Sequence, residues 1–456
     1  MPPPYPPAAA AIRSRYDKSV TAEAFAHRIV ALLRAAGHEA YFVGGCVRDL
    51  LLGRAAKDFD VATSARPEQL LQLFPSADRV GAHFGVVLVH DGDAHVEVAT
   101  FRSDLEYADG RHPVGVRFES DPRQDALRRD FTINALFLDP ATGEVKDWVG
   151  GRADLEAGII RAIGDPVQRF REDHLRLLRA VRFAARLAFR IEPVTMAAMR
   201  NEARSIAGVS AERVRDEIAR ILTEGGARRG FELLHESGLL QEVLPEVEAM
   251  KGVAQPPEYH PEGDVWIHTL LMLEKLREPS LALALGVLLH DVGKPPTFRV
   301  AGRIRFDGHV EKGVELAQRI LARLRVPHAV AGQAVALVAN HMKFMDVARM
   351  RESTLKRFLR QPEFEEHMEL HRVDCLSSHG DLRSYDFVRA KQRELPPEAL
   401  KPEPLVTGRD LIAAGYRPGP AFGELLREVE DAQLEGRVAT REQGMQLVRE
   451  KMAALL

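Results

Sequence analysis

The chain has 456 residues, more than one hydrophobic core usually organises, so about two to four domains are expected. Its composition, 45% hydrophobic and 28% charged, is that of a folded globular protein, and a net charge of −3 excludes a globally basic nucleic-acid-binding protein. Two cysteines exclude a disulfide framework, and no apolar run reaches the roughly 20 residues that span a bilayer, so we expect a cytoplasmic protein without a membrane partner.

The N-terminal third predicts strands mixed with helices. Residues 22–36 predict an amphipathic helix capped by Gly37. Residues 40–43 predict a buried strand that runs into two glycines and a short helix. Further strands are predicted at residues 59–62, 86–89, 95–101 and 132–138.

After about residue 151 the strand signals largely disappear, and from residue 171 the periodicity is helical. This order predicts an α+β protein, in which a mixed-sheet head precedes an all-α neck and body. The Pro/Ala-rich start lacks a signal-peptide pattern. The predicted parts are a disordered extension (1–18), the head (19–151), a helical neck and body (152–255), a second helical module (256–385) and a C-terminal helical tail (386–456).

Three acidic residues of the head point to metal chemistry. Side chains alternate along a strand, so Asp58 and Asp60 project to one face while Phe59 points into the core. Adjacent carboxylates repel unless cations lie between them, which suits two divalent ions that bind a triphosphate. A third carboxylate, Glu97, lies in an apolar strand, where burial requires a shared metal or an ion pair with Arg102.

The junction at Gly44-Gly45 suits phosphate binding. Glycines let backbone N–H groups approach phosphates closely, and the N-terminus of the following helix favours anions. Arg48 adds a charged fork for the same phosphates. Two glycines alone are more often a simple turn, but here the aspartate pair follows fourteen residues later.

Six segments in chain order resemble the class II tRNA nucleotidyltransferase and bacterial poly(A) polymerase superfamily. They are GGCVRD (44–49), DFD (58–60), EVATFR (97–102), RRDFTINAL (128–136), DPATGEVKDWVGGRADL (139–155) and REDHLRLLRAVRFAARL (171–187). The resemblance implies a polymerase-β-like nucleotidyltransferase head that uses Mg²⁺, held by Asp58 and Asp60, with Glu97 as the third catalytic carboxylate. It also implies nucleotide-binding residues, which are Gly44, Gly45 and Arg48 at the triphosphate and Arg129, Asp130 and Asn134 at the sugar and phosphates, the ribose 2′-OH meeting Asp130.

A predicted helix at residues 173–189 carries a basic stripe. Its members are Arg176, Arg179, Arg182 and Arg186, spaced by three, three and four residues. Such a stripe is usually a solvated face. Here, however, Asp173 and Arg176 resemble the family's base-selecting EDxxR element. The carboxylate accepts from an exocyclic amine and the guanidinium donates to the ring, so the pair selects C or A without a nucleic-acid template. The other arginines track RNA phosphates.

A second group of histidines and aspartates resembles the HD phosphohydrolase superfamily. Imidazole and carboxylate are suitable ligands for Mn, Fe, Ni or Zn. By the resemblance the metal ligands are His268, His290, Asp291, His309, His341 and Asp374, and Lys294 holds substrate phosphate. The implied reaction is phosphoester hydrolysis with one or two divalent ions (Mn, Fe, Ni, Zn or Mg), on 2′,3′-cyclic phosphates or damaged 3′ ends. The alternative is a helical scaffold that helps to hold tRNA.

The resemblance implies addition of CCA to tRNA from CTP and ATP. A CC-adding enzyme, an A-adding enzyme and a poly(A) polymerase stay open as alternatives. The long segment 103–116 and the absence of a basic pair at residues 82–84 favour CCA addition. A third hypothesis, an HD phosphohydrolase with a non-catalytic RNA-binding head, conflicts with the complete acidic set. The oligomeric state is open.

Overall fold

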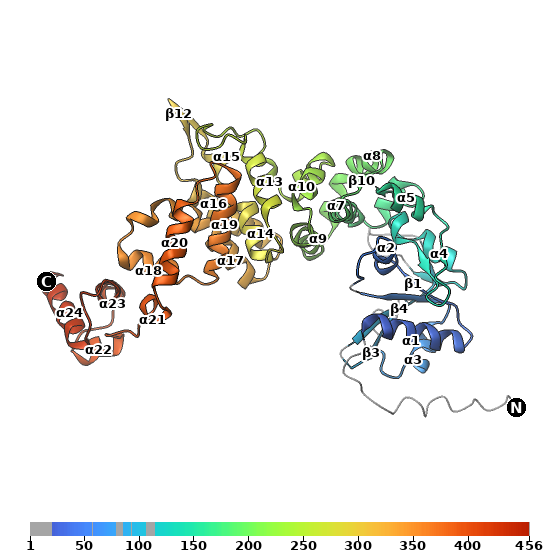
Figure 1. Ribbon diagram of the computed structural model, residues 1–456, viewed down its shortest axis with the longest axis horizontal. Helices are drawn as coiled ribbons and strands as arrows, with labels where there is room; N and C mark the ends of the chain where they lie inside the picture. The colour runs from blue at the N-terminus through green and yellow to red at the C-terminus, as the bar shows by residue number, and fades with distance from the viewer. Residues whose placement is uncertain (1–20, 57, 79–84, 93, 106–114, 456) are drawn as a thin grey trace. The chain divides into compact units, whose positions relative to one another are not determined.

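The computed structural model describes residues 21–56, 58–78, 85–92, 94–105 and 115–455 (Figure 1). The N-terminal extension, residues 82–84 and most of segment 103–116, on which expectations were placed, lie outside them. The chain divides into two compact units. The first unit extends to Ile221 and includes Glu232–Val243; the second comprises Leu222–Phe231 and continues from Leu244.

The first unit is built on a six-stranded mixed sheet of order β3-β4-β2-β1-β7-β8. Only β2 and β4 are parallel; the other neighbours are antiparallel. The strands are β1 (Ala40–Val43), β2 (Asp60–Thr63), β3 (Val86–Asp91), β4 (Ala94–Thr100), β7 (Phe137–Leu138) and β8 (Val145–Lys146). In the central pairs, Asp60 is the register partner of both Val43 and Glu97. The first acidic residue of β2 therefore lies beside the end of β1.

Helix α1 (Ala22–Ala35) follows the predicted helix closely and buries one apolar stripe at helical spacing. Its first turn is capped by the Thr21 hydroxyl, which accepts from Ala24 N at 3.2 Å. Around the sheet lie α2 (Gly45–Leu51), α3 (Pro67–Leu73), α4 (Pro122–Leu127), α5 (Gly151–Ala157) and the pairs β5 (Arg102–Asp104) with β6 (Val116–Phe118) and β9 (Ile159–Ile160) with β10 (Arg190–Ile191).

One predicted strand is wrong in its first half. Residues Thr132–Asn134 form a 3₁₀ turn, η3, and only Phe137–Leu138 pair in the sheet. The side chains explain this local fold, because Thr132 donates to Asp154 at 2.7 Å and Asn134 donates to Asp130 at 3.1 Å. Such polar side-chain bonds compete with strand pairing.

One predicted helix after the sheet differs from the structure at both of its ends. The predicted helix 173–189 begins instead at Arg176, because Asp173 is extended (φ −143°, ψ 105°), and it ends before Ala188, which is left-handed (φ 58°). The elements are α6 (Pro166–Glu172), α7 (Arg176–Leu187), α8 (Pro193–Glu202), η4 (Ala203–Gly208), α9 (Ala211–Thr223), α10 (Ala227–Glu236) and α11 (Leu239–Val243).

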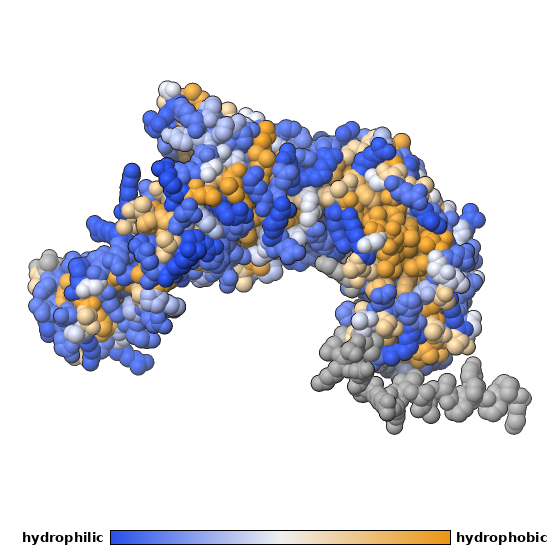
Figure 2. Space-filling view, viewed as in Figure 1, coloured by the Kyte–Doolittle hydropathy of each residue, from blue (hydrophilic) through white to orange (hydrophobic). Residues whose placement is uncertain are grey.

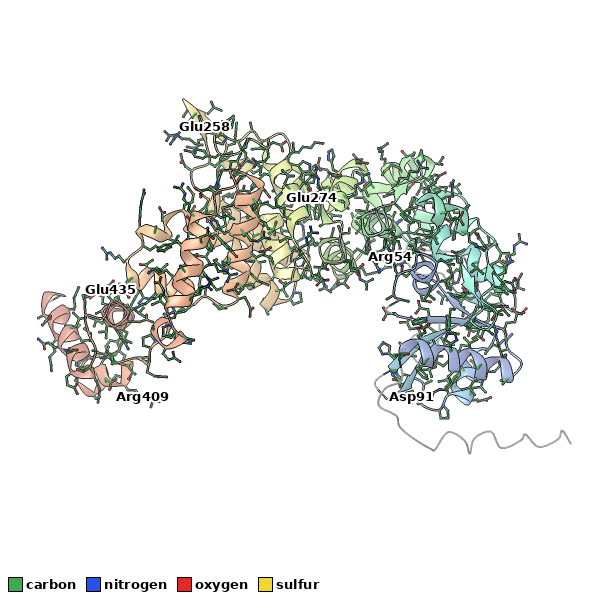
Figure 3. The ribbon with its side chains drawn as sticks, in the orientation of Figure 1. Arg54, Asp91, Glu258, Glu274, Arg409 and Glu435 are labelled. Atoms are coloured by element: carbon green, nitrogen blue, oxygen red, sulfur yellow. The ribbon has the colours of Figure 1, made fainter. Side chains whose placement is uncertain are left out.

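The second unit is helical apart from a short hairpin of β11 (Arg299–Ala301) and β12 (Arg303–Arg305), which the sequence did not predict. Hydrophilic side chains cover most of its visible face (Figure 2). Surface charges pair locally, as in Glu274 with Arg228 at 2.8 Å (Figure 3). Its helices are α12 (Pro245–Glu248), α13 (Val265–Lys275), α14 (Leu281–Leu289), α15 (Lys294–Thr297), α16 (His309–Arg323), α17 (His328–Asn340), η5 (His341–Arg349), α18 (Glu352–Leu359), α19 (Phe364–Ser377), α20 (Arg383–Glu394), α21 (Pro397–Leu400), α22 (Gly408–Ala413), α23 (Pro420–Leu434) and α24 (Arg441–Leu455).

Close helix packing in this unit depends on one glycine. A Cβ on Gly293 would lie 2.0 Å from the carbonyl oxygen of His309. Gly293 thus lets the chain after α14 touch the start of α16, and it brings two predicted metal-ligand segments together. Among the described residues, no helix has the length and apolar character needed to cross a bilayer.

Candidate functional site

The junction between β1 and α2 places a glycine beside an acidic side chain. Gly44 has φ 74° and ψ −133°, a conformation that favours glycine. A Cβ added there would lie 3.4 Å from Arg129 Nη1 and 3.5 Å from Asp60 Oδ2. The bare backbone of Gly44 therefore leaves room for a ligand group between a cation and a carboxylate.

Two of the three carboxylates of the predicted catalytic set belong to neighbouring strands, and the third, Asp58, lies two residues before β2. Asp60 opens β2 and is in register with Glu97 of β4. Asp58 is exposed, and Phe59 between the two aspartates is 5% exposed. The expected alternation of side chains is therefore present in this segment.

The burial expected for Glu97 is wrong. Its neighbours Val96 and Val98 are buried, whereas Glu97 lies on the opposite, exposed face of β4. Burial therefore supplies no argument for a metal at this residue. The alternative partner Arg102 contacts Asp104 at 3.1 Å.

Electrostatics nevertheless couples the three carboxylates. Burial, together with the negative charges of Glu97 and Asp58, raises the pKa of Asp60 to about 6, although Arg129 opposes this. A divalent cation would relieve this repulsion, and oxygen donors suit Mg²⁺. Among the described residues, the groups whose ligand atoms all lie within 4.8 Å of one another consist of histidines and carboxylates of the second unit. The three carboxylates of the head are more widely spaced than that.

A cleft of about 510 Å³ opens beside Asp60, and we call it the arginine cleft. Nine arginines and four aspartates line it, which suits a polyanionic ligand. All ten predicted nucleotide-binding residues line it, whereas Asp58 and Glu97 do not. The lining residues are Gly44, Gly45, Arg48, Asp60, Arg102, Asp104, Arg128, Arg129, Asp130, Asn134, Asp173, Leu175, Arg176, Arg179, Arg182, Phe183, Arg186 and Arg213.

A buried chain of hydrogen bonds crosses the arginine cleft. Arg48 donates to Asn134 Oδ1 at 2.8 Å, and Asn134 donates to Asp130 Oδ1 at 3.1 Å. Arg179 donates to Asp130 Oδ2 at 2.8 Å. Burial alone would raise the pKa of Asp130, but the Arg179 charge and the Asn134 amide lower it to about 2. These predicted nucleotide-binding residues are thus held by one another.

Asp125, which the sequence did not single out, organises two lining arginines. Its carboxylate is completely buried and contacts Arg128 Nη2 at 2.6 Å and Arg129 Nη2 at 3.0 Å. Both arginines lie within four residues of Asp125 along the chain. The i, i+3 and i, i+4 spacing was the signal that could have revealed this anchor.

The predicted base-selecting pair is not a contact between its own members. Asp173 accepts from Arg213 Nη2 at 3.0 Å, and Arg176 donates to Glu172 at 2.6 Å. Both side chains still line the arginine cleft. Arg213 lies 40 residues away in sequence, so its pairing with Asp173 could not be read from local spacing. Each member is held by further contacts, because Arg176 also donates to Arg169 O at 2.9 Å and Asp173 also accepts from Leu175 N at 3.1 Å.

In the second unit, five helical segments bring the predicted metal ligands together, with Asp374 on α19. His268 lies on α13, His290 and Asp291 follow α14, His309 opens α16 and His341 follows α17. Two groups result, and the ligand atoms within each lie within 4.8 Å of one another. The groups are His268 with His290 and Asp374, and Asp291 with His309 and His341.

Three of these imidazoles are oriented in the same way. Nδ1 lies 2.8 Å from Val287 O in His290, 2.9 Å from Phe306 O in His309 and 2.7 Å from Val338 O in His341. A carbonyl accepts only, so Nδ1 carries the proton and Nε2 keeps its lone pair. The Nε2 atoms of all three residues are buried and have no hydrogen-bond partner within the described part of the chain. Buried, unpaired imidazole nitrogens fit a metal ion.

His268 is held by carboxylates on both sides. Its Nδ1 lies 2.7 Å from Glu262 Oε1 and its Nε2 lies 3.2 Å from Asp374 Oδ1. Although burial opposes it, hydrogen bonds to Asp374 and Glu262 raise the pKa of His268 to about 9. Glu262 and the neighbouring His260, which it binds at 2.9 Å, were missed in the sequence. The signal available there was a His-x-Glu pair six residues before His268.

Lys294 faces the same centre but is already paired. Its Nζ lies 2.6 Å from Asp291 Oδ2 and donates to Gln255 Oε1 at 2.7 Å. Lys294 therefore neutralises Asp291 in this structure. An ammonium group has three N–H donors, so the predicted phosphate contact does not require Lys294 to give up either of these partners.

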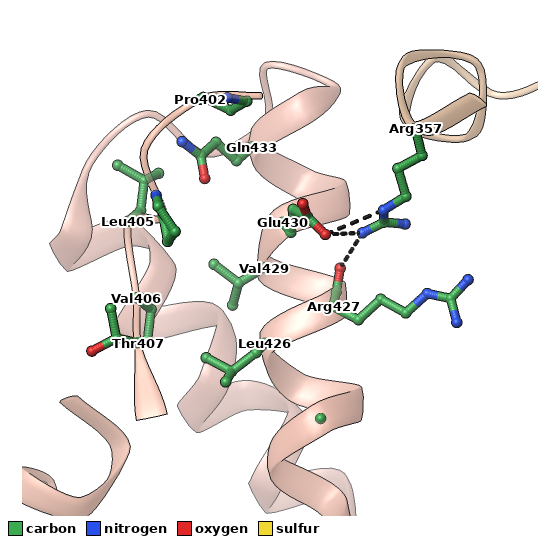
Figure 4. Close-up of a pocket in the computed structure, with 12 residues that line it drawn as sticks. Arg357, Pro402, Leu405, Val406, Thr407, Leu426, Arg427, Val429, Glu430 and Gln433 are labelled. Atoms are coloured by element: carbon green, nitrogen blue, oxygen red, sulfur yellow. Dashed lines mark hydrogen bonds and ion pairs between the residues drawn. The ribbon is translucent and has the colours of Figure 1, made fainter. Parts of the chain in front are cut away.

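A further cavity of about 580 Å³ lies near the C-terminal segment of the second unit (Figure 4). Its lining is largely apolar, and Arg357 closes one side by contacting Glu430 at 2.6 Å. It contains none of the metal-ligand groups found among the described residues.

Three family descriptions match the chain in order. Residues 40–161 match the poly A polymerase head domain, residues 188–251 the probable RNA and SrmB-binding site of polymerase A, and residues 263–382 the HD domain.

Curated and solved proteins match most of the chain. It is 36% identical to the multifunctional CCA protein of Nitrosococcus oceani, over 86% of this chain and 96% of that protein. It is 31% identical to the CCA-adding enzyme of Bacillus subtilis, over 90% and 94% respectively. The Bacillus stearothermophilus CCA-adding enzyme in complex with CTP matches with 28% identity and a TM-score of 0.74, over 96% of this chain and 99% of that chain.

Proposed function

Because the chain belongs to the family of CCA-adding tRNA nucleotidyltransferases and poly(A) polymerases, we propose that it completes tRNA 3′ ends by adding CCA from CTP and ATP. The observation that carries the proposal is the arginine cleft beside Gly44 and Asp60. In this cleft the arginines, the backbone of Gly44 and the carboxylate of Asp60 lie close together. Transfer of a nucleotide from a triphosphate requires positive charge for the phosphates and a carboxylate for the metal ion at one place.

We assign the residues as follows. Asp58 and Asp60, with Glu97, would hold Mg²⁺, which when bound polarises the triphosphate and the attacking hydroxyl. Gly44, Gly45 and Arg48 would hold the triphosphate. Arg129 and Asn134 would contact the nucleotide, and Asp130, whose oxygens the network fixes in place, would accept from the ribose 2′-OH.

Base choice is assigned to Asp173 and Arg176. Arg213 and Glu172 orient them, and the carboxylate and guanidinium together would match the donor and acceptor pattern of C or A but not of U or G. Arg179 and Arg182 would complete the nucleotide site, and Arg182 is itself fixed by Glu217 at 2.7 Å. The proposed partners are therefore tRNA, CTP and ATP. The proposed location of the activity is the cytoplasm.

The test offers purified protein tRNAs that lack CCA, CA or A, with each nucleotide separately. Addition of CC from CTP and of the final A from ATP supports the proposal. A product that stops at CC, addition of A alone, or a long poly(A) tail would instead identify one of the related activities. UTP and GTP should give little product.

We propose a second function, phosphoester hydrolysis, for the histidine–aspartate centre. The specific support is the set of three buried imidazole Nε2 atoms that converge on the Asp291 carboxylate, at 3.1 Å for His290, 3.9 Å for His309 and 3.8 Å for His341. His268, His290, Asp291, His309, His341 and Asp374 would hold one or two divalent ions, which when bound activate water for attack on phosphorus. Metal analysis of purified protein, with hydrolysis of nucleoside 2′,3′-cyclic phosphates, tests this function. Absence of both bound metal and hydrolysis would leave the unit as a scaffold.

A further inference from the structure

The β11–β12 hairpin of the second unit carries three arginines on one face. Arg299 is the register partner of Arg305, and Arg303 is the partner of Ala301. Cross-strand partners and residues two apart share a face of a hairpin. All three arginines are exposed, and the hairpin projects from the neighbouring helices (Figure 1). The result is a single basic surface.

This arrangement is unfavourable without an anion. Arg299 and Arg305 are directly opposite each other, and like charges in that position destabilise a strand pair. Within the described part of the chain, none of the three guanidinium groups has a carboxylate partner. Guanidinium forks match phosphate oxygens well, so a phosphate would remove the repulsion and satisfy the donors.

Aromatic and apolar side chains accompany the arginines. Phe298 at the start of the hairpin is 39% exposed and Val300 is 72% exposed. Because side chains alternate along a strand, Phe298 and Val300 lie on the face of the hairpin opposite the arginines. The arginine face therefore recognises a ligand through its guanidinium groups, which suit the phosphates of a nucleic-acid backbone.

The base of the hairpin contacts the histidine–aspartate centre directly. The ring centroid of Phe306, which follows β12, lies 5.9 Å from that of Phe298 and 6.5 Å from that of His309. Lys294 Nζ lies 5.3 Å from the centre of the same ring. A nucleic-acid strand that lies along the hairpin therefore extends toward the candidate metal ligands.

We propose that this hairpin binds the phosphodiester backbone of an RNA whose 3′ end is processed at the histidine–aspartate centre. The inference rests on the hydrolase function proposed above and adds the surface that holds its RNA substrate. The arginines act on binding, whereas the histidines and aspartates act on the terminal phosphoester.

The test compares two substrates that share the same bond, cytidine 2′,3′-cyclic phosphate and tRNA that ends in a 2′,3′-cyclic phosphate. In the variant R299Q/R303Q/R305Q, hydrolysis of the mononucleotide should be unchanged, while kcat/KM for the tRNA should fall about tenfold or more. The slope of log KM for the tRNA against log salt should fall by about 2. The control R277Q/R349Q/R393Q removes the same charge from three exposed arginines elsewhere in the second unit and should leave both substrates unaffected. Equal loss for both substrates, or no loss for tRNA, overturns the proposal.

A second measurement does not depend on hydrolysis. A photocrosslinking amino acid in place of Ala301, on the arginine face, should crosslink to labelled tRNA, and the crosslink should disappear in the triple-glutamine variant. The same amino acid in place of Ile412, which is 53% exposed, serves as the control. Absence of the hairpin crosslink overturns the inference. A crosslink without any hydrolysis by the wild type supports the hairpin contact while rejecting the hydrolase function.

Discussion

At the residue scale, the first unit fixes its polar groups by pairing them with one another. Asp130 is the clearest case, because its two oxygens accept from Asn134, Arg179 and the backbone N–H of Phe131. Such a carboxylate stabilises the fold only while it is ionised. Function and stability therefore depend on the same charge.

The pH dependence of Asp130 follows from its lowered pKa of about 2. Because the folded-state pKa lies below the unfolded value, the stabilisation is present above pH ~4 and is lost as the pH falls toward 2. Asp130→Asn should therefore lower the free energy of unfolding by on the order of 2 kcal/mol at pH 7 and by about half as much at pH 3. Trp148 fluorescence during urea unfolding reports the first unit if Trp266 is replaced by Phe. A difference that does not shrink at low pH would contradict this role of the charge.

The same residue tests nucleotide selection. If Asp130 accepts from the ribose 2′-OH, Asp130→Asn should reduce the preference for CTP over dCTP by about tenfold. Competition between the two nucleotides in a single reaction measures this ratio directly. An unchanged ratio, with the protein folded at pH 7, would remove Asp130 from sugar recognition.

At the scale of elements, the junction between α6 and α7 carries the base-selecting residues. Asp173→Ala should relax the preference for CTP over UTP by at least about tenfold while lowering turnover less, because the carboxylate reads the base edge. Arg213→Gln, which removes only the partner of Asp173, should produce a smaller change in the same direction. Single-nucleotide incorporation assays give both ratios. Full selectivity in Asp173→Ala would refute the template role.

The packing at Gly293 provides a second element-scale test. Gly293→Ala would place a methyl group 2.0 Å from His309 O, so the second unit should lose about 1–3 kcal/mol of stability and bind less metal. Gly332→Ala on α17 meets no heavy atom within 4 Å and should be neutral or stabilising. Thermal unfolding and metal content compare the two. Equal behaviour of the two variants would contradict the packing argument.

The pattern of apolar residues along the chain predicted helices and strands well where it matches the burial of the side chains in the structure. The strand at Ala40–Val43 and the helix at Ala22–Ala35 lie within a residue of their predicted ends. The strand at residues 132–138 failed because Thr132 and Asn134 bond locally through their side chains. The exposed hairpin was missed although its arginines alternate with Phe298, Val300 and Ile304, because each of its strands is only three residues long.

Sequence spacing located the cleft residues better than it located their partners. All ten predicted nucleotide-binding residues meet in the arginine cleft, because the segments that carry them are short and polar. The pairing of Asp173 with Arg213 depends on contacts between helices, which spacing along one helix does not reveal. The exposure of Glu97 was misjudged because a strand's two faces cannot be ranked by sequence alone. The domain boundaries and the residue roles stay predictions.

At the scale of the whole molecule, each of the two units contains one candidate site. Asp291→Asn should remove metal binding and hydrolysis in the second unit while leaving nucleotide addition within about twofold of the wild type. Metal content and both activities should be measured on the same preparation. Loss of nucleotide addition in a folded Asp291→Asn protein would contradict separate sites.

The most direct test of the account is single-turnover incorporation of CMP into tRNA that lacks CCA, by the wild type and by Asp60→Asn. The account predicts that Asp60→Asn still binds CTP in the arginine cleft but incorporates it about a thousandfold or more slowly, because the metal loses a ligand. Hydrolysis at the second unit should be unaffected. Incorporation within tenfold of the wild-type rate would contradict the central claim that Asp60 and its neighbouring carboxylates carry nucleotide transfer.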